Sequence, residues 1–229
     1  RRVLFRSRRF ADEYRLPLTA GMTADVNGCA LAYARALANY DVRFLLTHVH
    51  AHHGHVPFGK RTLPFCWDLG NGKRLIVHHG EHYHLGNELG MSPGAVQNYL
   101  IFRGQKVRGF DEEEFDRRLR LYVRGLHETG WPYTWATLTC AGMMTDNSPP
   151  SPAIVGRIDR WNVMATTSGL PTIRMVTLDQ LATTIERDAD RLPTFAGDWP
   201  DWWADGTAGD PEGTQLFRHA QRERQWIAS

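Results

Sequence analysis

The sequence predicts an α/β fold in which helices cover a largely parallel sheet. Short runs rich in β-branched and aromatic residues alternate along the chain with runs that carry apolar residues at helical spacing, and this alternation is typical of parallel sheets. The chain has 229 residues, of which 42% are hydrophobic and 23% are charged, so it is long and apolar enough to bury a sizeable core. These observations favour a folded globular protein over a disordered one.

The charge balance and the hydropathy pattern narrow the class of protein further. Lys and Arg number 27 against 25 Asp and Glu, and the resulting charge of +2 is too small to predict a nucleic-acid partner. No apolar run approaches the ~18 residues of a membrane span, and no signal-peptide core follows the basic start. Cys29, Cys66 and Cys140 are widely spaced, which argues against a disulfide framework or a thiolate zinc site. We therefore expect a soluble protein with neither nucleic-acid nor membrane partners.

The first half of the chain begins with an irregular segment and continues with β and helical runs. Residues 1–15 carry five arginines within the first ten positions and match no periodic pattern, so we expect a non-native or disordered leader, with a nucleic-acid- or membrane-binding arm as the alternative. The elements expected next are a strand over 18–22, an Ala-rich helix over 29–40 and a buried strand over 42–49. Asn71-Gly72 then predicts a type I′ turn within a hairpin over 64–78, expected to be an excursion from the main sheet.

The second half contains the most strongly patterned helix. Residues 111–128 combine acidic residues in the first turn with apolar residues on one face. The elements expected after it are a strand over 133–140, a helix over 152–166, a strand over 172–176 and a helix from Thr177, its N-cap, to about residue 191. Residues 16–195 are thus expected to form the α/β domain. Residues 196–229 are expected to form a connector and the first helix of a following helical domain.

Two aspartates follow expected strands and precede expected helices. Asp25 lies in the run Thr-Ala-Asp-Val-Asn-Gly, and Asp146 lies in the run Thr-Asp-Asn-Ser-Pro-Pro. Ligand sites in parallel α/β folds lie at the carboxyl ends of strands, and glycoside hydrolysis needs two carboxyl groups there, one as nucleophile or base and one as proton donor. Each aspartate alone is also typical of a helix N-cap or a turn, and this alternative stays open.

Histidines are the most unusual feature of the composition. Nine of the eleven lie in two groups, at 48, 50, 52, 53 and 55 and at 78, 79, 82 and 84. This density permits a metal-dependent hydrolase, although the spacing matches no HExxH or similar motif. The alternative is a polar pocket wall that binds sugar hydroxyls, in which we place His50 and His53.

Aromatic side chains supply a further carbohydrate signal. Their faces stack on the apolar faces of sugars, although simple core packing explains tryptophans equally well. The side chains expected to contact substrate are Trp67, Tyr83 and Asn147, together with His50 and His53.

Four segments of the sequence lie at 22–28, at 64–67, at 145–150 continuing to 160–162, and at 197–203. In this order they together resemble the catalytic domain of glycoside hydrolase family 38, the α-mannosidases, in its divergent bacterial form. The resemblance implies a seven-stranded β/α barrel, of which this chain would hold a part, and a retaining mechanism with one zinc ion. It implies that Asp25 is the nucleophile and a zinc ligand, and that Asp146 lies near the position of the acid/base. The family usually has Asp-Pro-Phe-Gly at the nucleophile, whereas this chain has Asp-Val-Asn-Gly.

The resemblance also implies that this chain is an internal fragment of a larger glycosidase, truncated at both ends. Most zinc ligands would then lie outside it, and the fragment alone would be inactive. The expected substrate is an α-mannoside or a related glycoside, and the expected compartment is the bacterial cytoplasm. Two other functions remain open, namely a noncatalytic carbohydrate-binding or structural α/β module and a metal-dependent hydrolase that uses the histidine cluster.

Overall fold

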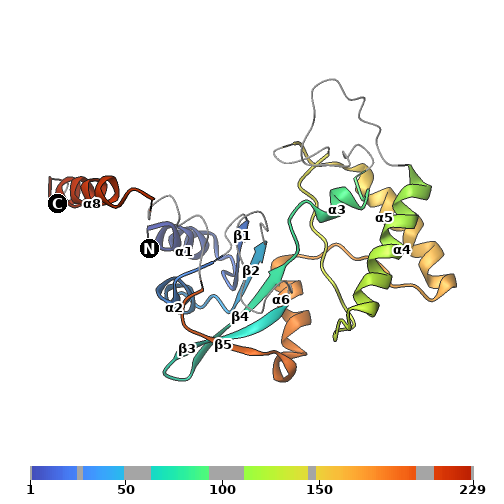
Figure 1. Cartoon of the computed structure of the whole chain (residues 1–229), viewed down its shortest axis with the longest axis horizontal. Coiled ribbons are helices and arrows are strands. Elements are labelled where there is room, and N and C mark those ends of the chain that lie inside the picture. The colour runs from blue at the N-terminus through green and yellow to red at the C-terminus, as the bar shows by residue number, and fades with distance from the viewer. Residues whose placement is uncertain are drawn as a thin grey trace.

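The computed structural model describes residues 2–24, 28–48, 63–92, 111–143, 148–199 and 209–227. It confirms the predicted α/β class, because a five-stranded sheet lies between helices that pack on both of its faces (Figure 1). A second group of helices lies to one side of the sheet and has a core of its own.

The sheet is mostly parallel. Its strands are β1 (Ala20–Ala24), β2 (Phe44–His48), β3 (Pro64–Gly70), β4 (Lys73–Gly80) and β5 (Thr194–Ala196). They are arranged in the order β1-β2-β4-β3-β5, in which only the pairing of β3 with β4 is antiparallel. Because β1 and β5 lie at the two ends of this order, the described strands form an open sheet. Closure into a seven-stranded barrel stays a prediction.

The β3–β4 hairpin belongs to the main sheet, so the prediction that it is an excursion is wrong. β4 pairs with β2 along Phe44↔Ile76 to His48↔Gly80 and is therefore a central strand. Its second half is buried on both faces, as a central parallel strand requires. The turn itself is as predicted, since Asn71 (φ 56°) and Gly72 (φ 73°) both adopt the left-handed conformation of a type I′ turn.

Different helices cover the two faces of the sheet. Successive residues of a strand point to opposite faces, so alternate residues of β2 and β4 pack against α2 (Leu31–Ala38) and against α6 (Leu178–Glu186). The core on the α2 face contains Ala34, Leu37, Leu45, Phe65, Trp67, Leu75, Val77 and Trp199. The core on the α6 face contains Phe44, Leu46, Ile76, Tyr133, Ala182 and Ile185. Thr177 is the N-cap of α6, as predicted, and it forms a capping box with Gln180.

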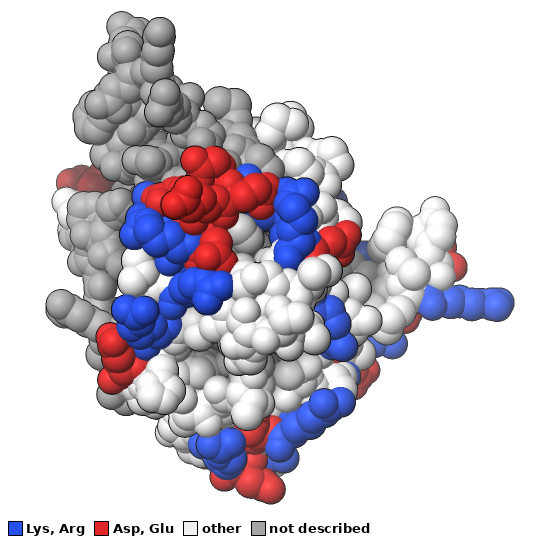
Figure 2. Space-filling model, turned by 90° about the vertical axis from the view of Figure 1, so that its right-hand side faces the viewer, with Lys and Arg blue, Asp and Glu red and all other residues white. Residues whose placement is uncertain are grey.

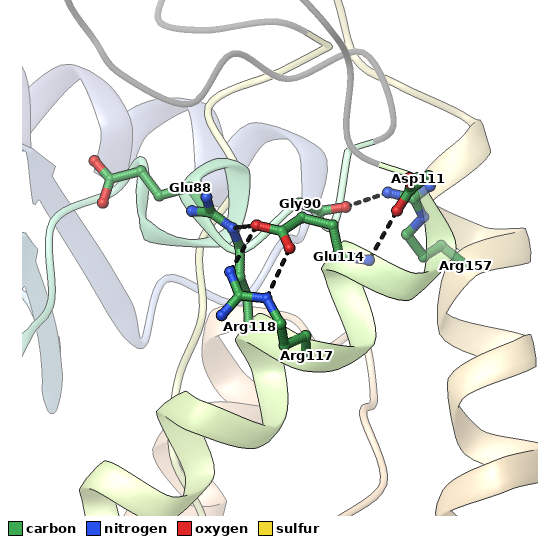
Figure 3. A network of polar contacts seen from close by, with 7 residues as sticks. All are labelled: Glu88, Gly90, Asp111, Glu114, Arg117, Arg118 and Arg157. Carbon is green, nitrogen blue, oxygen red and sulfur yellow. Dashed lines mark hydrogen bonds and ion pairs between the residues drawn. The ribbon is translucent and has the colours of Figure 1, made fainter.

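The helical unit consists of α3 (Leu85–Glu88), α4 (Glu112–Glu128) and α5 (Ala153–Ser168). Asp111 caps α4 by accepting a hydrogen bond from the Glu114 backbone N–H at 2.8 Å. The guanidinium of the buried Arg157 donates to the Gly90 carbonyl at 2.5 Å, and the guanidinium of the half-buried Arg118 donates to the Glu88 carbonyl at 2.9 Å (Figure 3). These contacts hold α4 and α5 against the backbone at the end of α3.

Charged side chains of both signs lie side by side on the outer surface of this unit (Figure 2). Glu114 accepts hydrogen bonds from the guanidinium groups of Arg117 and Arg118, which lower the pKa of its carboxyl to about 2. Glu112 pairs in the same way with Arg157 and Arg160. The charges on this face of the described chain are therefore largely paired with opposite charges.

Two predicted strands are absent. Residues 133–140 and 172–176 run without strand structure. In the first segment the Trp135 carbonyl accepts from the Trp131 indole and the Thr139 carbonyl accepts from the Gly86 backbone N–H of α3. Asn87 of α3 binds the Ala141 N–H and the Gly142 carbonyl just beyond the first segment. Asn162 of α5 binds both the N–H and the carbonyl of Ile173 in the second. These two segments of β-rich composition are thus bound to α3 and α5 and do not join the sheet.

The two ends of the described chain are helical. α1 (Arg2–Tyr14) occupies the segment expected to be a non-native or disordered leader; it is helical rather than disordered, and a non-native origin stays a prediction. α8 (Pro211–Ile227) confirms the predicted last helix and extends away from the sheet (Figure 1). The segment 194–199, expected to belong partly to a connector, instead adds β5 and the buried Trp199 to the sheet. Within the described residues, no helix is both long and apolar enough to cross a membrane.

Candidate functional site

The carboxyl ends of the three parallel strands lie side by side and carry buried polar side chains. Ala24, His48 and Gly80, the last residues of β1, β2 and β4, are register partners across the sheet. One position earlier in register lie Thr23, Thr47 and His79. This is the edge at which ligands bind in parallel α/β folds.

On the α2 face of this edge, four side chains form what we call the Thr47–His79 cluster: Thr23, Thr47, His79 and Trp199. Thr47 and His79 are 0% and 1% exposed, and the Thr47 Oγ1 lies 2.7 Å from the His79 Nδ1 in a hydrogen bond. The indole of Trp199 meets the imidazole of His79 edge to face, with the ring centroids 6.2 Å apart. Thr23 adjoins Thr47 as its register partner on β1.

Three polar atoms of this cluster are buried without a hydrogen-bond partner among the described residues. They are the hydroxyl of Thr23, the Nε2 of His79 and the indole Nε1 of Trp199. A buried polar atom without a partner costs about 1–3 kcal/mol, so native proteins rarely leave several together. Such a group is a candidate for binding a ligand or water.

The imidazoles of His78 and His79 are neutral at physiological pH. Burial, with the neighbouring imidazoles of His79 and His48, lowers the pKa of His78 to about 3. Burial, with the imidazole of His48, lowers the pKa of His79 to about 4. A neutral imidazole has one donor and one acceptor nitrogen, so His79 can offer hydrogen bonds but no charge to a ligand.

The opposite face of the same strands binds a neighbouring segment of the chain, although the Nδ1 of His78 is also buried without a partner among the described residues. His78 Nε2 lies 2.8 Å from the hydroxyl of Thr137, and its ring meets Trp135 edge to face. His48 Nδ1 lies 2.9 Å from the Glu81 carbonyl and its Nε2 lies 3.5 Å from the hydroxyl of Thr139. These contacts fix the segment 131–143, which leads toward Asp146, to the carboxyl ends of β2 and β4.

The residues expected to form the site are described only in part. Five of them lie outside the described residues, namely Asp25, Asp146, His50, His53 and Asn147. The structure therefore gives no distance between the two aspartates. Their described neighbours in sequence are Ala24, at the end of β1, and Met143, whose carbonyl accepts a hydrogen bond from Ser92.

The two expected aromatic contacts have different surroundings. Tyr83 lies beside the candidate edge, where it stacks on His82 with centroids 4.3 Å apart and meets the ring of His48. Trp67 is fully buried in the α2-face core, and its indole N–H donates to the Gly197 carbonyl at 2.9 Å. It differs from the expected role because a sugar needs an exposed ring face, and Trp67 has none.

The described residues do not by themselves fit a zinc ion. Within them, no group of three or more His, Cys, Asp or Glu side chains could hold a metal. The three cysteines are free, as expected, and burial raises the pKa of the Cys140 thiol to about 11. Asp25 and the histidines at 50–55 lie outside this test.

The sequence pattern indicates His79 only as a member of the histidine groups, and it does not indicate Thr47 or Trp199 as site residues. The available signal was a change of polarity along two strands, because β2 ends in Thr-His after Phe-Leu-Leu and β4 ends in His-His after Leu-Ile-Val. Polar residues at the carboxyl end of otherwise apolar buried strands are typical of a site. Trp199 had no such signal, because its place beside His79 depends on the return of the chain through β5.

Comparison with known proteins finds distant similarity among solved structures. No family model matches the chain, and no curated protein matches it. Among solved structures, the chain is similar to an α-mannosidase from Enterococcus faecalis V583, with a TM-score of 0.49 and 11% sequence identity. The similarity covers 82% of this chain, which spans 18% of the length of that enzyme.

Proposed function

We propose that this chain is part of a retaining glycosidase of the α-mannosidase type, with Asp25 as its nucleophile and Asp146 as its acid/base. The observation that supports the proposal is the row of buried polar side chains at the carboxyl ends of β1, β2 and β4. Asp25 is the residue that directly follows β1 in the sequence. The order of the four sequence segments that resemble glycoside hydrolase family 38 supports the same assignment.

The chemistry requires two carboxyl groups with separate roles. In a retaining glycosidase one carboxylate attacks the anomeric carbon, while the other carboxyl group protonates the leaving oxygen and then deprotonates the attacking water. We assign the first role to Asp25 and the second to Asp146. The neutral side chains of the Thr47–His79 cluster would surround the sugar without competing for the positive charge that develops on it.

Zinc is a further part of the proposal. Zinc bound at such a site would hold ring hydroxyls of the sugar and help to orient it. Asp25 is the ligand that we assign in this chain, with most other ligands outside it. The described residues do not gather a donor set for zinc.

The test uses the full-length product of the gene that encodes this sequence. We expect it to hydrolyse an aryl α-mannoside with retention of anomeric configuration, as followed by proton NMR. Asp25→Asn should lower kcat by a factor on the order of 10³ or more. An activated 2-fluoro-mannoside should leave a covalent adduct on Asp25, detected by peptide mass spectrometry.

A matched control is Asp41→Asn. Asp41 is an exposed aspartate in the left-handed conformation that asparagine tolerates, and its ion pair with Arg8 is on the surface. We expect this variant to keep wild-type kcat. Equal activity in the Asp25→Asn variant and the wild-type protein would refute the assignment. Sugar binding without turnover would favour a noncatalytic carbohydrate-binding module, and loss of activity with His50→Gln but not with Asp25→Asn would favour a metal-dependent hydrolase.

A further inference from the structure

Asn71 and Gly72 form the tip of the β3–β4 hairpin. Both residues are exposed, and both adopt the left-handed conformation of the type I′ turn, with φ angles of 56° and 73°. The tip lies at the amino end of β4, at the opposite end of that strand from the Thr47–His79 cluster (Figure 1). No described atom lies within 4 Å of the position that a Cβ on Gly72 would take, so the space around this residue is open.

Asn71 differs in its surroundings from the other three asparagines among the described residues. The side-chain amides of Asn87 and Asn162 are hydrogen-bonded to the backbone of segments packed against them. Asn39 is exposed like Asn71, but its Oδ1 accepts a hydrogen bond from a lysine ammonium at 3.1 Å, and Tyr40 follows it in the sequence. Of these four asparagines, Asn71 is the one that is both exposed and followed by glycine.

The missing Cβ of Gly72 matters for the chemistry of the Asn71 side chain. The backbone nitrogen of the residue after an asparagine can attack the carbon of the asparagine amide, and a side chain on that next residue obstructs the approach. Glycine has no side chain and permits the closest approach of its backbone. Ring closure also requires local rotation of the backbone, which an exposed tip in open space allows more readily than a packed element.

We propose that Asn71 is a site of spontaneous deamidation, in which the backbone nitrogen of Gly72 attacks the side-chain amide carbon of Asn71. A bond forms between the Gly72 nitrogen and the Asn71 Cγ, the bond from Cγ to Nδ2 breaks, and Nδ2 leaves as ammonia with the proton of the Gly72 N–H. Water then opens the cyclic succinimide and returns a proton to the Gly72 nitrogen. Attack of water at Cγ yields aspartate, and attack at the backbone carbonyl carbon yields isoaspartate. The net reaction consumes water and releases ammonia, without an oxidant or a reductant.

The isoaspartate product changes the hairpin itself. Its main chain runs through the former side-chain carbon, which lengthens the two-residue turn by a methylene group. Gly70 and Lys73 are register partners across this turn, and β4 lies between β3 and β2 in the sheet. A lengthened connection no longer has the type I′ geometry, so isoaspartate should weaken the pairing of a central strand. The aspartate product should not, because Asp-Gly also forms type I′ turns.

Peptide mass spectrometry of the folded full-length protein, incubated at pH 8, tests the proposal. Trypsin releases peptide 62–73, in which Asn71 is the only asparagine, and peptide 36–43, in which Asn39 is the only asparagine. Asn39 is the matched control, because it is exposed but is followed by Tyr40. We expect the heavier, deamidated form to accumulate at Asn71 on the order of 10-fold or more faster than at Asn39. Equal rates at the two asparagines would overturn the proposal.

Two variants test the roles of the two residues. Asn71→Gly removes the amide but keeps a residue that readily adopts the left-handed conformation, so its peptide 62–73 should stay unmodified. Gly72→Ala adds a Cβ beside the attacking nitrogen and should slow the loss of the Asn71 amide on the order of 10-fold. Because alanine is strained at a φ of 73°, this comparison is repeated in urea, where folding has no influence. Equal rates for wild type and Gly72→Ala in urea, or a heavier peptide in Asn71→Gly, would contradict attack by Gly72 on Asn71.

The two products are distinguished by their effects on stability. Asn71→Asp reproduces the aspartate product and should unfold at the same urea concentration as the wild type. The isoaspartate fraction, separated by chromatography from aged wild-type protein, should unfold at a lower urea concentration. A wild-type midpoint for that fraction would refute the expected weakening of β4. The inference is independent of the proposed function, because the hairpin tip lies at the other end of β4 from the candidate site.

Discussion

Acidification from pH 7 to pH 5 should destabilise this protein through His78 and His79. In the folded chain their pKa values lie at about 3 and about 4, whereas an unfolded histidine has a pKa of 6.5. At pH 5 the folded imidazoles therefore remain neutral, while those of the unfolded chain take up protons. Folding stability is thus lost as the pH falls below 6.5, and the loss continues until the folded pKa values are reached.

The magnitude follows from this difference in proton binding. Each pH unit between the two pKa values changes the free energy of unfolding by about 1.4 kcal/mol per group, so pH 5 costs about 2 kcal/mol for each histidine relative to pH 7. The two together cost about 4 kcal/mol, a large part of the ~5–15 kcal/mol that stabilises a typical protein. Carboxyl groups whose pKa is lowered, such as Glu114 with a pKa of about 2, titrate below this window.

Urea unfolding followed by tryptophan fluorescence at pH 7, 6 and 5 measures the effect. His78→Gln and His79→Gln remove one titrating group each, so each should reduce the difference between pH 7 and pH 5 by about 2 kcal/mol, whatever its effect on absolute stability. His127→Gln, at an exposed position in the last turn of α4, is the control and should keep the wild-type difference. Equal pH dependence in wild type and both buried variants would refute the reasoning.

Three further predictions concern how the chain holds its shape. Thr177→Ala removes the hydroxyl that caps α6 and should cost about 1 kcal/mol in urea unfolding, an effect that Thr177→Ser should largely reverse. Arg157→Met leaves the Gly90 carbonyl without its buried donor and should cost about 2 kcal/mol; an unchanged midpoint would show that this contact is dispensable. Gly86→Ala would place a Cβ 2.5 Å from the Sγ of Cys140, so it should displace the segment around that thiol. Burial raises the pKa of this thiol and makes its reaction slow, so the variant should react faster with a disulfide reagent at pH 8.

Much of the fold could be predicted from local pattern. The Asn71-Gly72 turn, the capped start of α6 at Thr177 and the amphipathic α4 depend on contacts within a few residues, and all three are present. The place of the hairpin could not be predicted, because pairing of β4 with β2 joins residues about thirty positions apart. The two absent strands show the same limit, since a β-rich run becomes a strand only where a neighbour offers its backbone, and Asn162 takes that place for Ile173.

The candidate site could be predicted less fully, for a physical reason. Asp25 and Asp146 were selected because carboxylates after strands suit glycoside chemistry, and their arrangement stays a prediction outside the described residues. Trp67 was selected by residue type, yet a tryptophan can stack on a sugar only if a ring face is exposed, and its burial is set by the packing of β3 against Trp199. Residue type therefore indicates the chemistry that is possible, while burial decides which side chains can perform it.

The two consecutive histidines of β4 illustrate how one strand can serve both structure and binding. His78 and His79 point to opposite faces because successive strand residues alternate, and each makes a hydrogen bond to a threonine hydroxyl. The partner of His78 is Thr137, on a segment that has no strand of its own and is held by such contacts. The partner of His79 is Thr47, on the neighbouring strand, which would hold the ring even if nothing else bound it. The bond to Thr137 thus holds the segment 131–143 against the sheet, whereas the bond to Thr47 joins two neighbouring strands. In both histidines the second ring nitrogen is buried without a partner among the described residues.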